Sequence, residues 1–176
     1  AGKHFTIIAV AEGAITKEDA ALPKKKLKEK QEKKGYPSVA YELAEKEGYT
    51  FIHPFDDLAV ATGQGTIAME IVQELPLVDY ILVPIGGGGL ATGVSTLAKL
   101  LNPHIKVIGV EPAGAACMKA SLEKGEVVTL PHVNTIADGT AVQTPGKNIF
   151  PYIQENLDDI ITIDDDELIV AFLDMV

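Results

Sequence analysis

The sequence of 176 residues has a single cysteine, Cys117. One cysteine excludes an intramolecular disulfide and a zinc site built from clustered thiolates, and it agrees with a reducing compartment. No uninterrupted apolar stretch approaches the roughly 18 to 20 residues of a membrane span. The N-terminus also lacks the basic, apolar and small-residue order of a signal peptide. We therefore expect a cytoplasmic protein with no membrane partner.

Basic residues are in the minority, with 15 Lys and Arg against 25 Asp and Glu and a formal net charge of -10. This balance argues against general nucleic-acid binding. The charge is unevenly spread, because lysines crowd residues 24–34 and acids crowd residues 164–167. We interpret the lysine-rich segment as a solvated helix face rather than a site for a polyanion.

Short apolar runs alternate with amphipathic segments along the chain. This alternation predicts an α/β fold: a doubly wound, mainly parallel sheet with helices on both faces, in a Rossmann-like three-layer lobe. The expected strands are residues 5–10, 49–52, 80–85, 106–110 and 160–163, and the expected helices are 24–33, 39–47, 59–75, 90–101, 115–123 and 165–175. Residues 125–146 lack periodicity and predict a long irregular loop, which in a compact domain is usually functional or mobile.

Four consecutive glycines, Gly86, Gly87, Gly88 and Gly89, follow the apolar run 80–85 and precede Leu90, in the first turn of the next expected helix. A loop without side chains exposes successive backbone N–H groups, and the helix dipole adds positive potential in the same space. Glycines also serve tight turns and close packing. Four in a row lose much backbone entropy on folding with no packing in return, so the sequence predicts a phosphate-bearing small-molecule ligand.

The identity of that ligand stays open on spacing alone. Gly86, Gly88 and Ala91 fit the dinucleotide fingerprint, and Glu111 ends the next strand about where a ribose-binding carboxylate belongs. The interval to Glu111 is slightly longer than the usual count, and the fingerprint does not require four glycines. An NAD-type dinucleotide and another phosphate ligand are therefore equally favoured at this point.

Two further glycines, Gly63 and Gly65, lie within an expected helix. Glycines there can line a cofactor cleft, or they can allow tight packing against the sheet. We favour the packing role.

Five motifs, at residues 51–57, 63–71, 84–90, 109–112 and 135–142, occur in the order and spacing typical of serine/threonine dehydratases. From about residue 45 onward the chain resembles the threonine ammonia-lyase family of fold-type II pyridoxal-phosphate enzymes. The resemblance implies that Gly86, Gly87, Gly88, Gly89 and the amide of Leu90 hold the phosphate of pyridoxal phosphate. It also implies the family reaction, which removes water from L-threonine or L-serine and then releases ammonia and a 2-oxo acid.

The chain departs from this family at the residues that do the chemistry. The family's imine-forming lysine lies in a Ser-x-Lys-x-Arg-Gly type motif that this sequence lacks, so we assign no catalytic residue and expect the chain alone to be inactive. Some members hold a divalent cation, and Glu111 and the carbonyl of Ala115 match two of its ligands. Cys117 stands where the third, an aspartate, would be, and a hard cation prefers oxygen. We therefore predict no metal and a loop-capping role for Glu111.

Residues 2–43 do not fit the dehydratase pattern and resemble a strand and helix of the phosphofructokinase family, with Glu12 as its sugar-phosphate acid. The sequence thus predicts two parts, a segment of different origin at 1–43 and a dehydratase-type lobe at 44–176. Because the chain ends inside a helical pattern, we expect that lobe to be truncated at its C-terminus. An exposed face left by a missing lobe would favour homo-oligomers. A chimeric chain that folds without activity is the remaining alternative.

Overall fold

The computed structural model describes residues 44–46, 48 and 50–175, and the chain divides into two compact units, Ala1–Pro54 and Phe55–Val176. The strand expected at 5–10, the helix at 24–33 and the phosphofructokinase-like segment 1–43 lie outside the described residues. Residues 44–46 are helical, as expected from the prediction at 39–47. The strand predicted at 49–52 is wrong for residues 50–52, which have no regular secondary structure, and residue 49 lies outside the described residues.

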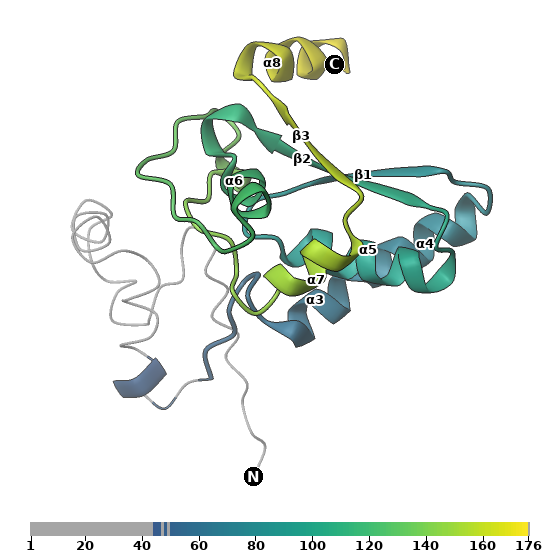
Figure 1. Cartoon of the computed structure of the whole chain (residues 1–176), viewed down its shortest axis with the longest axis horizontal. Coiled ribbons are helices and arrows are strands. Elements are labelled where there is room, and N and C mark those ends of the chain that lie inside the picture. The colour runs from purple at the N-terminus through teal and green to yellow at the C-terminus, as the bar shows by residue number, and fades with distance from the viewer. Residues whose placement is uncertain (1–43, 47, 49, 176) are drawn as a thin grey trace, which may run out of the picture. The chain divides into compact units, whose positions relative to one another are not determined.

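The second unit contains a parallel sheet in the order β1-β2-β3 (Figure 1). Its strands are β1 (Tyr80–Pro84), β2 (Lys106–Pro112) and β3 (Asp159–Ile163), and in the register Ile81 lies opposite Val107 and Gly109 opposite Ile160. The helices are α3 (Leu58–Gln64), α4 (Thr66–Glu74), α5 (Gly89–Leu101), α6 (Cys117–Lys124), α7 (Phe150–Asn156) and α8 (Asp165–Asp174). Three predicted strands and the predicted α/β class with a mainly parallel sheet are confirmed.

Helix α5 is the centre of the core. It packs on β1 and β2 and contacts α3, α4 and α7, which lie with it on one side of the sheet (Figure 1). The sheet contributes the buried side chains of Ile81, Val83 and Val107, and α5 those of Ala91, Val94 and Ala98. On the opposite face of the sheet, Tyr80, Leu82 and Ile161 are 64%, 62% and 41% exposed.

The helix predicted at 59–75 is divided by Gly65 into α3 and α4. A Cβ on Gly65 would lie 3.2 Å from Gly93 O, and a Cβ on Gly93 would overlap Ala61 O. The backbones of α3 and α5 therefore approach closely, and at Gly93 no room is left for a side chain. Gly65 has a packing role, but against α5 and not against the sheet as predicted. Among the described residues nothing lies within 4 Å of a Cβ on Gly63, so the packing role predicted for Gly63 is wrong.

Caps set several of the remaining boundaries. The Asp57 carboxylate accepts hydrogen bonds from the amides of Ala59 and Val60 at the start of α3. Asp164 and Glu167 form a reciprocal capping box that starts α8, close to the predicted position. Helix α7 is not predicted by the sequence analysis. Residues 125–146 form the predicted irregular loop, apart from the short 3-10 turn Asp138–Thr140.

Within the residues described, no helix combines the length and apolar character needed to cross a bilayer.

Candidate functional site

The glycine loop joins the carboxyl end of β1 to the amino end of α5. Ile85 N–H still donates to Val110 O across the sheet, and α5 begins at Gly89, so only three glycines lie outside regular structure. Gly88 has φ of +103°, a conformation that L side chains rarely adopt. The predicted junction of strand, glycine loop and helix is thus confirmed, although its function is not tested by this geometry alone.

Neighbouring side chains pack directly against the α-carbons of the loop. A Cβ on Gly87 would overlap the Phe55 ring, and a Cβ on Gly88 would lie 2.6 Å from both Met118 Cε and Ile149 Cδ1. A Cβ on Gly89 would lie 2.8 Å from Phe55 O. The sequence argument that these glycines give no packing is therefore wrong, because their lack of a side chain is what permits this close approach.

All three carbonyl oxygens of the loop accept hydrogen bonds from protein donors. The pairs are Thr92 N–H to Gly88 O at 2.9 Å, Gly146 N–H to Gly87 O at 2.9 Å, and the Cys117 thiol to Gly86 O at 3.9 Å. These bonds fix the orientation of three successive peptide groups. The loop's acceptors are therefore already occupied by the protein.

The backbone N–H groups of the same loop have no such partners. Among the described residues no hydrogen bond uses the amides of Gly86, Gly87, Gly88, Gly89 or Leu90. Buried amides without an acceptor are rare in proteins, and Gly87, Gly88 and Gly89 are buried. The last two amides of the row also belong to the first turn of the 13-residue helix α5, where the helix dipole is positive. Donors without acceptors at this place fit a phosphate group.

Glu111 lies one strand away, at the carboxyl end of β2, and is completely buried. Its two carboxylate oxygens accept hydrogen bonds from Met118 N–H at 2.8 Å and Lys119 N–H at 2.9 Å, in the first turn of α6. Burial raises the pKa of Glu111 to about 7, although both hydrogen bonds oppose the rise. The side chain therefore has a structural role, as predicted, but it caps helix α6 and not a loop. Because its oxygens are occupied, Glu111 is not available to a ribose hydroxyl. The dinucleotide alternative therefore lacks the ribose-binding carboxylate that it requires.

Cys117 lies between Glu111 and the glycine loop. Its Sγ is 4.0 Å from Glu111 Oε1 and 3.9 Å from Gly86 O. Burial, and then the charge of Glu111, raise the pKa of the Cys117 thiol to about 12, so the thiol keeps its proton and acts as a donor. Over the described part of the chain, no three metal-binding side chains gather in one place.

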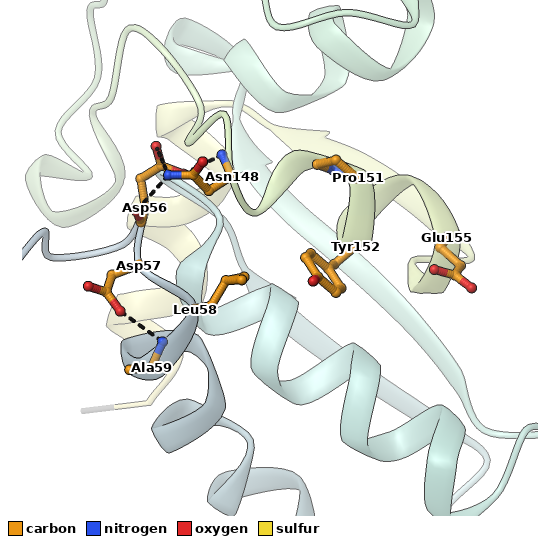
Figure 2. A pocket seen from close by; sticks show the side chains of 8 residues that line it. All are labelled: Asp56, Asp57, Leu58, Ala59, Asn148, Pro151, Tyr152 and Glu155. Atoms are coloured by element: carbon orange, nitrogen blue, oxygen red, sulfur yellow. Dashed lines mark hydrogen bonds between the residues drawn. The ribbon is translucent and has the colours of Figure 1, made fainter.

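An open pocket of about 740 Å³ lies beside the start of α3 and along α7, and none of its lining residues belongs to the glycine loop. Figure 2 shows Asp56 beside Asn148 on one side, and Tyr152 and Glu155 projecting from α7 on the other. Asp56 accepts a hydrogen bond from Asn148 N–H at 2.7 Å and so ties the segment before α3 to the start of α7. Because Asp56, Asp57 and Glu155 line the pocket, it is unsuited to a phosphate.

Residues 25–176 match the family described as pyridoxal-phosphate dependent enzymes, and the chain belongs to this family. The prediction of a pyridoxal-phosphate enzyme and of its cofactor is thereby confirmed at the level of this broader family. The match begins inside the segment 1–43 that the sequence analysis assigned to another origin.

Several proteins of known activity are similar to this chain. The L-threonine ammonia-lyase of Geobacter sulfurreducens is 46% identical over 136 residues, which are 77% of this chain and 34% of that protein. A biosynthetic L-threonine dehydratase of Salmonella typhimurium is 49% identical over 136 residues, 77% of this chain and 26% of its own length. The chain thus spans about a quarter to a third of the curated relatives it matches.

Solved structures agree with this assignment. Threonine deaminase isoform 2 from Solanum lycopersicum superposes with a TM-score of 0.76 at 44% identity, over 78% of this chain and 40% of that one. Maize serine racemase gives a TM-score of 0.75 at 37% identity, over 78% of this chain and 42% of that one.

Proposed function

We propose that this chain is the cofactor-phosphate-binding part of an L-threonine or L-serine dehydratase, and that the glycine loop holds the phosphate of pyridoxal phosphate. The observation that carries the proposal is the row of amides from Gly86 to Leu90 that have no acceptor among the described residues. They lie in a loop whose carbonyls are all bonded to the protein. Family membership supports the identity of the ligand, since pyridoxal phosphate carries one terminal phosphate.

The chain's own residues would act by binding and orientation. The five amides would donate to phosphate oxygens, and the amino end of α5 would stabilise the negative charge. Phe55, Met118 and Ile149 pack behind the glycines and would keep the loop from relaxing when the ligand leaves.

When bound, pyridoxal phosphate supplies an electron sink for the electron pair left by a departing α-proton. The relatives' names support threonine as the substrate class. We propose further that this chain binds the cofactor without turnover, because its sequence lacks the family's lysine motif and it matches only part of each relative.

The proposal is tested by calorimetric titration with pyridoxal phosphate, pyridoxal, inorganic phosphate and NAD at matched ionic strength. Pyridoxal has the same aldehyde but no phosphate, so it controls for adventitious reaction with surface lysines. We expect saturable binding of pyridoxal phosphate, weaker binding of inorganic phosphate, and none of pyridoxal or NAD. Equal binding of pyridoxal and pyridoxal phosphate would contradict the phosphate cradle, and binding of NAD alone would restore the dinucleotide alternative.

The origin of the first residues is a separate matter. The family match begins at residue 25 and so overlaps the segment 1–43 for which the phosphofructokinase resemblance predicted a different origin. Tight binding of a sugar phosphate that is lost in Glu12→Gln would support that resemblance, and unchanged binding would remove it.

A further inference from the structure

We propose that Glu111 is a positioning residue for the glycine loop: by capping α6 from the end of β2, it holds Cys117 and Met118 against Gly86 and Gly88. The inference rests on the proposed phosphate-binding function of that loop. According to this inference, the affinity of the loop for its ligand depends in part on Glu111, a buried acid outside the loop.

The first step is that α6 has no cap of its own. The residue at its N-cap position, Ala116, makes no side-chain hydrogen bond to the helix. Glu111 takes this role from a different element, since its carboxylate accepts from the second and third amides of α6 at 2.8 and 2.9 Å. The position of the first turn of α6 is therefore fixed relative to the end of β2.

The second step is that this first turn touches the loop. Cys117 Sγ lies 3.9 Å from Gly86 O, and Met118 Cε lies 2.6 Å from the place a Cβ would take on Gly88. Both side chains are fully buried. Because a protein interior is close-packed, a shift of the first turn of α6 also moves Gly86 and Gly88.

The third step concerns the ligand. Amides that converge on one phosphate must be held in a fixed arrangement, and their own carbonyls supply that constraint through bonds to Thr92, Gly146 and Cys117. Only the bond from Cys117 comes from an element capped by Glu111. Weakening the cap should therefore loosen the start of the loop while Gly87 O and Gly88 O stay bonded.

The test compares Glu111→Gln with Asp158→Asn in the full chain. Gln keeps the shape of Glu111 but places an amide donor against one of the two helix amides, so one cap bond is lost. Asp158 also accepts a backbone hydrogen bond, from Val107, but at the other end of β2 and away from the loop. We expect both variants to lower stability in urea, but only Glu111→Gln to weaken pyridoxal phosphate binding, by about tenfold, roughly the effect of one lost hydrogen bond.

Two further measurements keep the test decisive. Met118→Leu conserves volume but removes the terminal methyl beside Gly88, and should also weaken binding with little loss of stability. Hydrogen exchange of the Gly86 to Leu90 amides, without ligand, should be faster in Glu111→Gln than in Asp158→Asn at equal global stability.

The outcomes separate the inference from the function on which it rests. If the wild type binds pyridoxal phosphate, and Glu111→Gln binds it with the same affinity and shows the same hydrogen exchange in the loop, only the positioning role is overturned. Absence of pyridoxal phosphate binding by the wild type would overturn the proposed function, and the exchange measurement would still decide whether Glu111 positions the loop.

Discussion

The two ends of β2 are each held by one carboxylate, in opposite surroundings. At the amino end, Asp158 accepts from Val107 N–H and is paired with Lys99 Nζ at 2.6 Å and Lys106 Nζ at 2.8 Å. At the carboxyl end, Glu111 accepts two backbone N–H groups and is bonded to no lysine ammonium within the described part of the chain. At the amino end the negative charge of the carboxylate is therefore compensated by two lysine ammonium groups. At the carboxyl end, an acid bonded only to neutral groups lies near a loop whose amides have no acceptor among the described residues.

The pKa values of the two acids express this difference. Burial acts to raise the pKa of Asp158, but the hydrogen bonds from Lys106, Lys99 and Val107 outweigh it and lower the pKa to about 2. Burial dominates at Glu111 and raises its pKa to about 7. A satisfied ion pair of the first kind serves stability. A buried carboxyl group with a strongly raised pKa, of the second kind, is more typical of a functional site.

The largest expected effect comes from adding a methyl group at the carboxyl end, in Gly87→Ala. The new Cβ would overlap the Phe55 ring, so we expect a stability loss of about 3 kcal/mol and loss of pyridoxal phosphate binding. Urea unfolding and calorimetry measure the two effects.

The matched control is Gly63→Ala, in α3. No atom of the described residues lies within 4 Å of the new Cβ there. A helical glycine replaced by alanine without strain should raise stability by about 0.5–1 kcal/mol and leave binding unchanged. If both alanine variants bound the cofactor equally well, the glycine loop would have no special part in binding.

The next effect is expected at the amino end, in Asp158→Ala. This change removes the acceptor of Val107 N–H and leaves the half-buried Lys99 ammonium without its carboxylate. We expect a stability loss of about 2 kcal/mol, with pyridoxal phosphate affinity unchanged at a temperature where the variant stays folded. Weaker binding by folded Asp158→Ala would show that the two ends of β2 are not independent.

A smaller effect should appear in the dependence of stability on pH, where the two acids act with opposite sign. The pKa of Glu111 rises on folding from 4.5, so its contribution falls as pH increases from about 4.5 to 7. The pKa of Asp158 falls on folding from 3.8, so its contribution is present above about 4 and is lost as pH drops toward 2. Urea unfolding should show that Glu111→Gln removes the first slope and Asp158→Asn the second. Identical pH profiles for the two variants would contradict the assigned pKa shifts.

Much of this fold could be predicted from the sequence, because the features that specify it are local. The apolar runs at β1, β2 and β3 and the Asp164 to Glu167 capping box each show their role within a few residues. The packing of Gly65 could not be predicted, since its neighbour Gly93 lies 28 positions away along the chain. Helix α7 was missed because it is only seven residues long and gives little periodicity.

The same distinction applies to the candidate site. Gly86 to Leu90 could be identified because the strand, the glycines and the helix start are contiguous. The partners that occupy the loop's carbonyls come from Gly146 and Cys117, and the ring against Gly87 comes from Phe55. No local pattern joins these residues. The sequence therefore predicted the position of the glycine loop between strand and helix, but not why these glycines are required by packing.

The smallest effect we predict is a fractional uptake of protons when pyridoxal phosphate binds near pH 7. Glu111 is linked to the loop through Cys117, with successive distances of 4.0 and 3.9 Å. A phosphate dianion at the loop would raise the pKa of Glu111 further from about 7, so part of the population would take up a proton. Titrations in buffers of different ionisation enthalpy measure this uptake. The part of the proton uptake that comes from Glu111 should disappear in Glu111→Gln and persist in Asp158→Asn. The ionisation of the phosphate itself is common to all three proteins and cancels, so equal uptake in all three would mean that the buried acid does not sense the ligand.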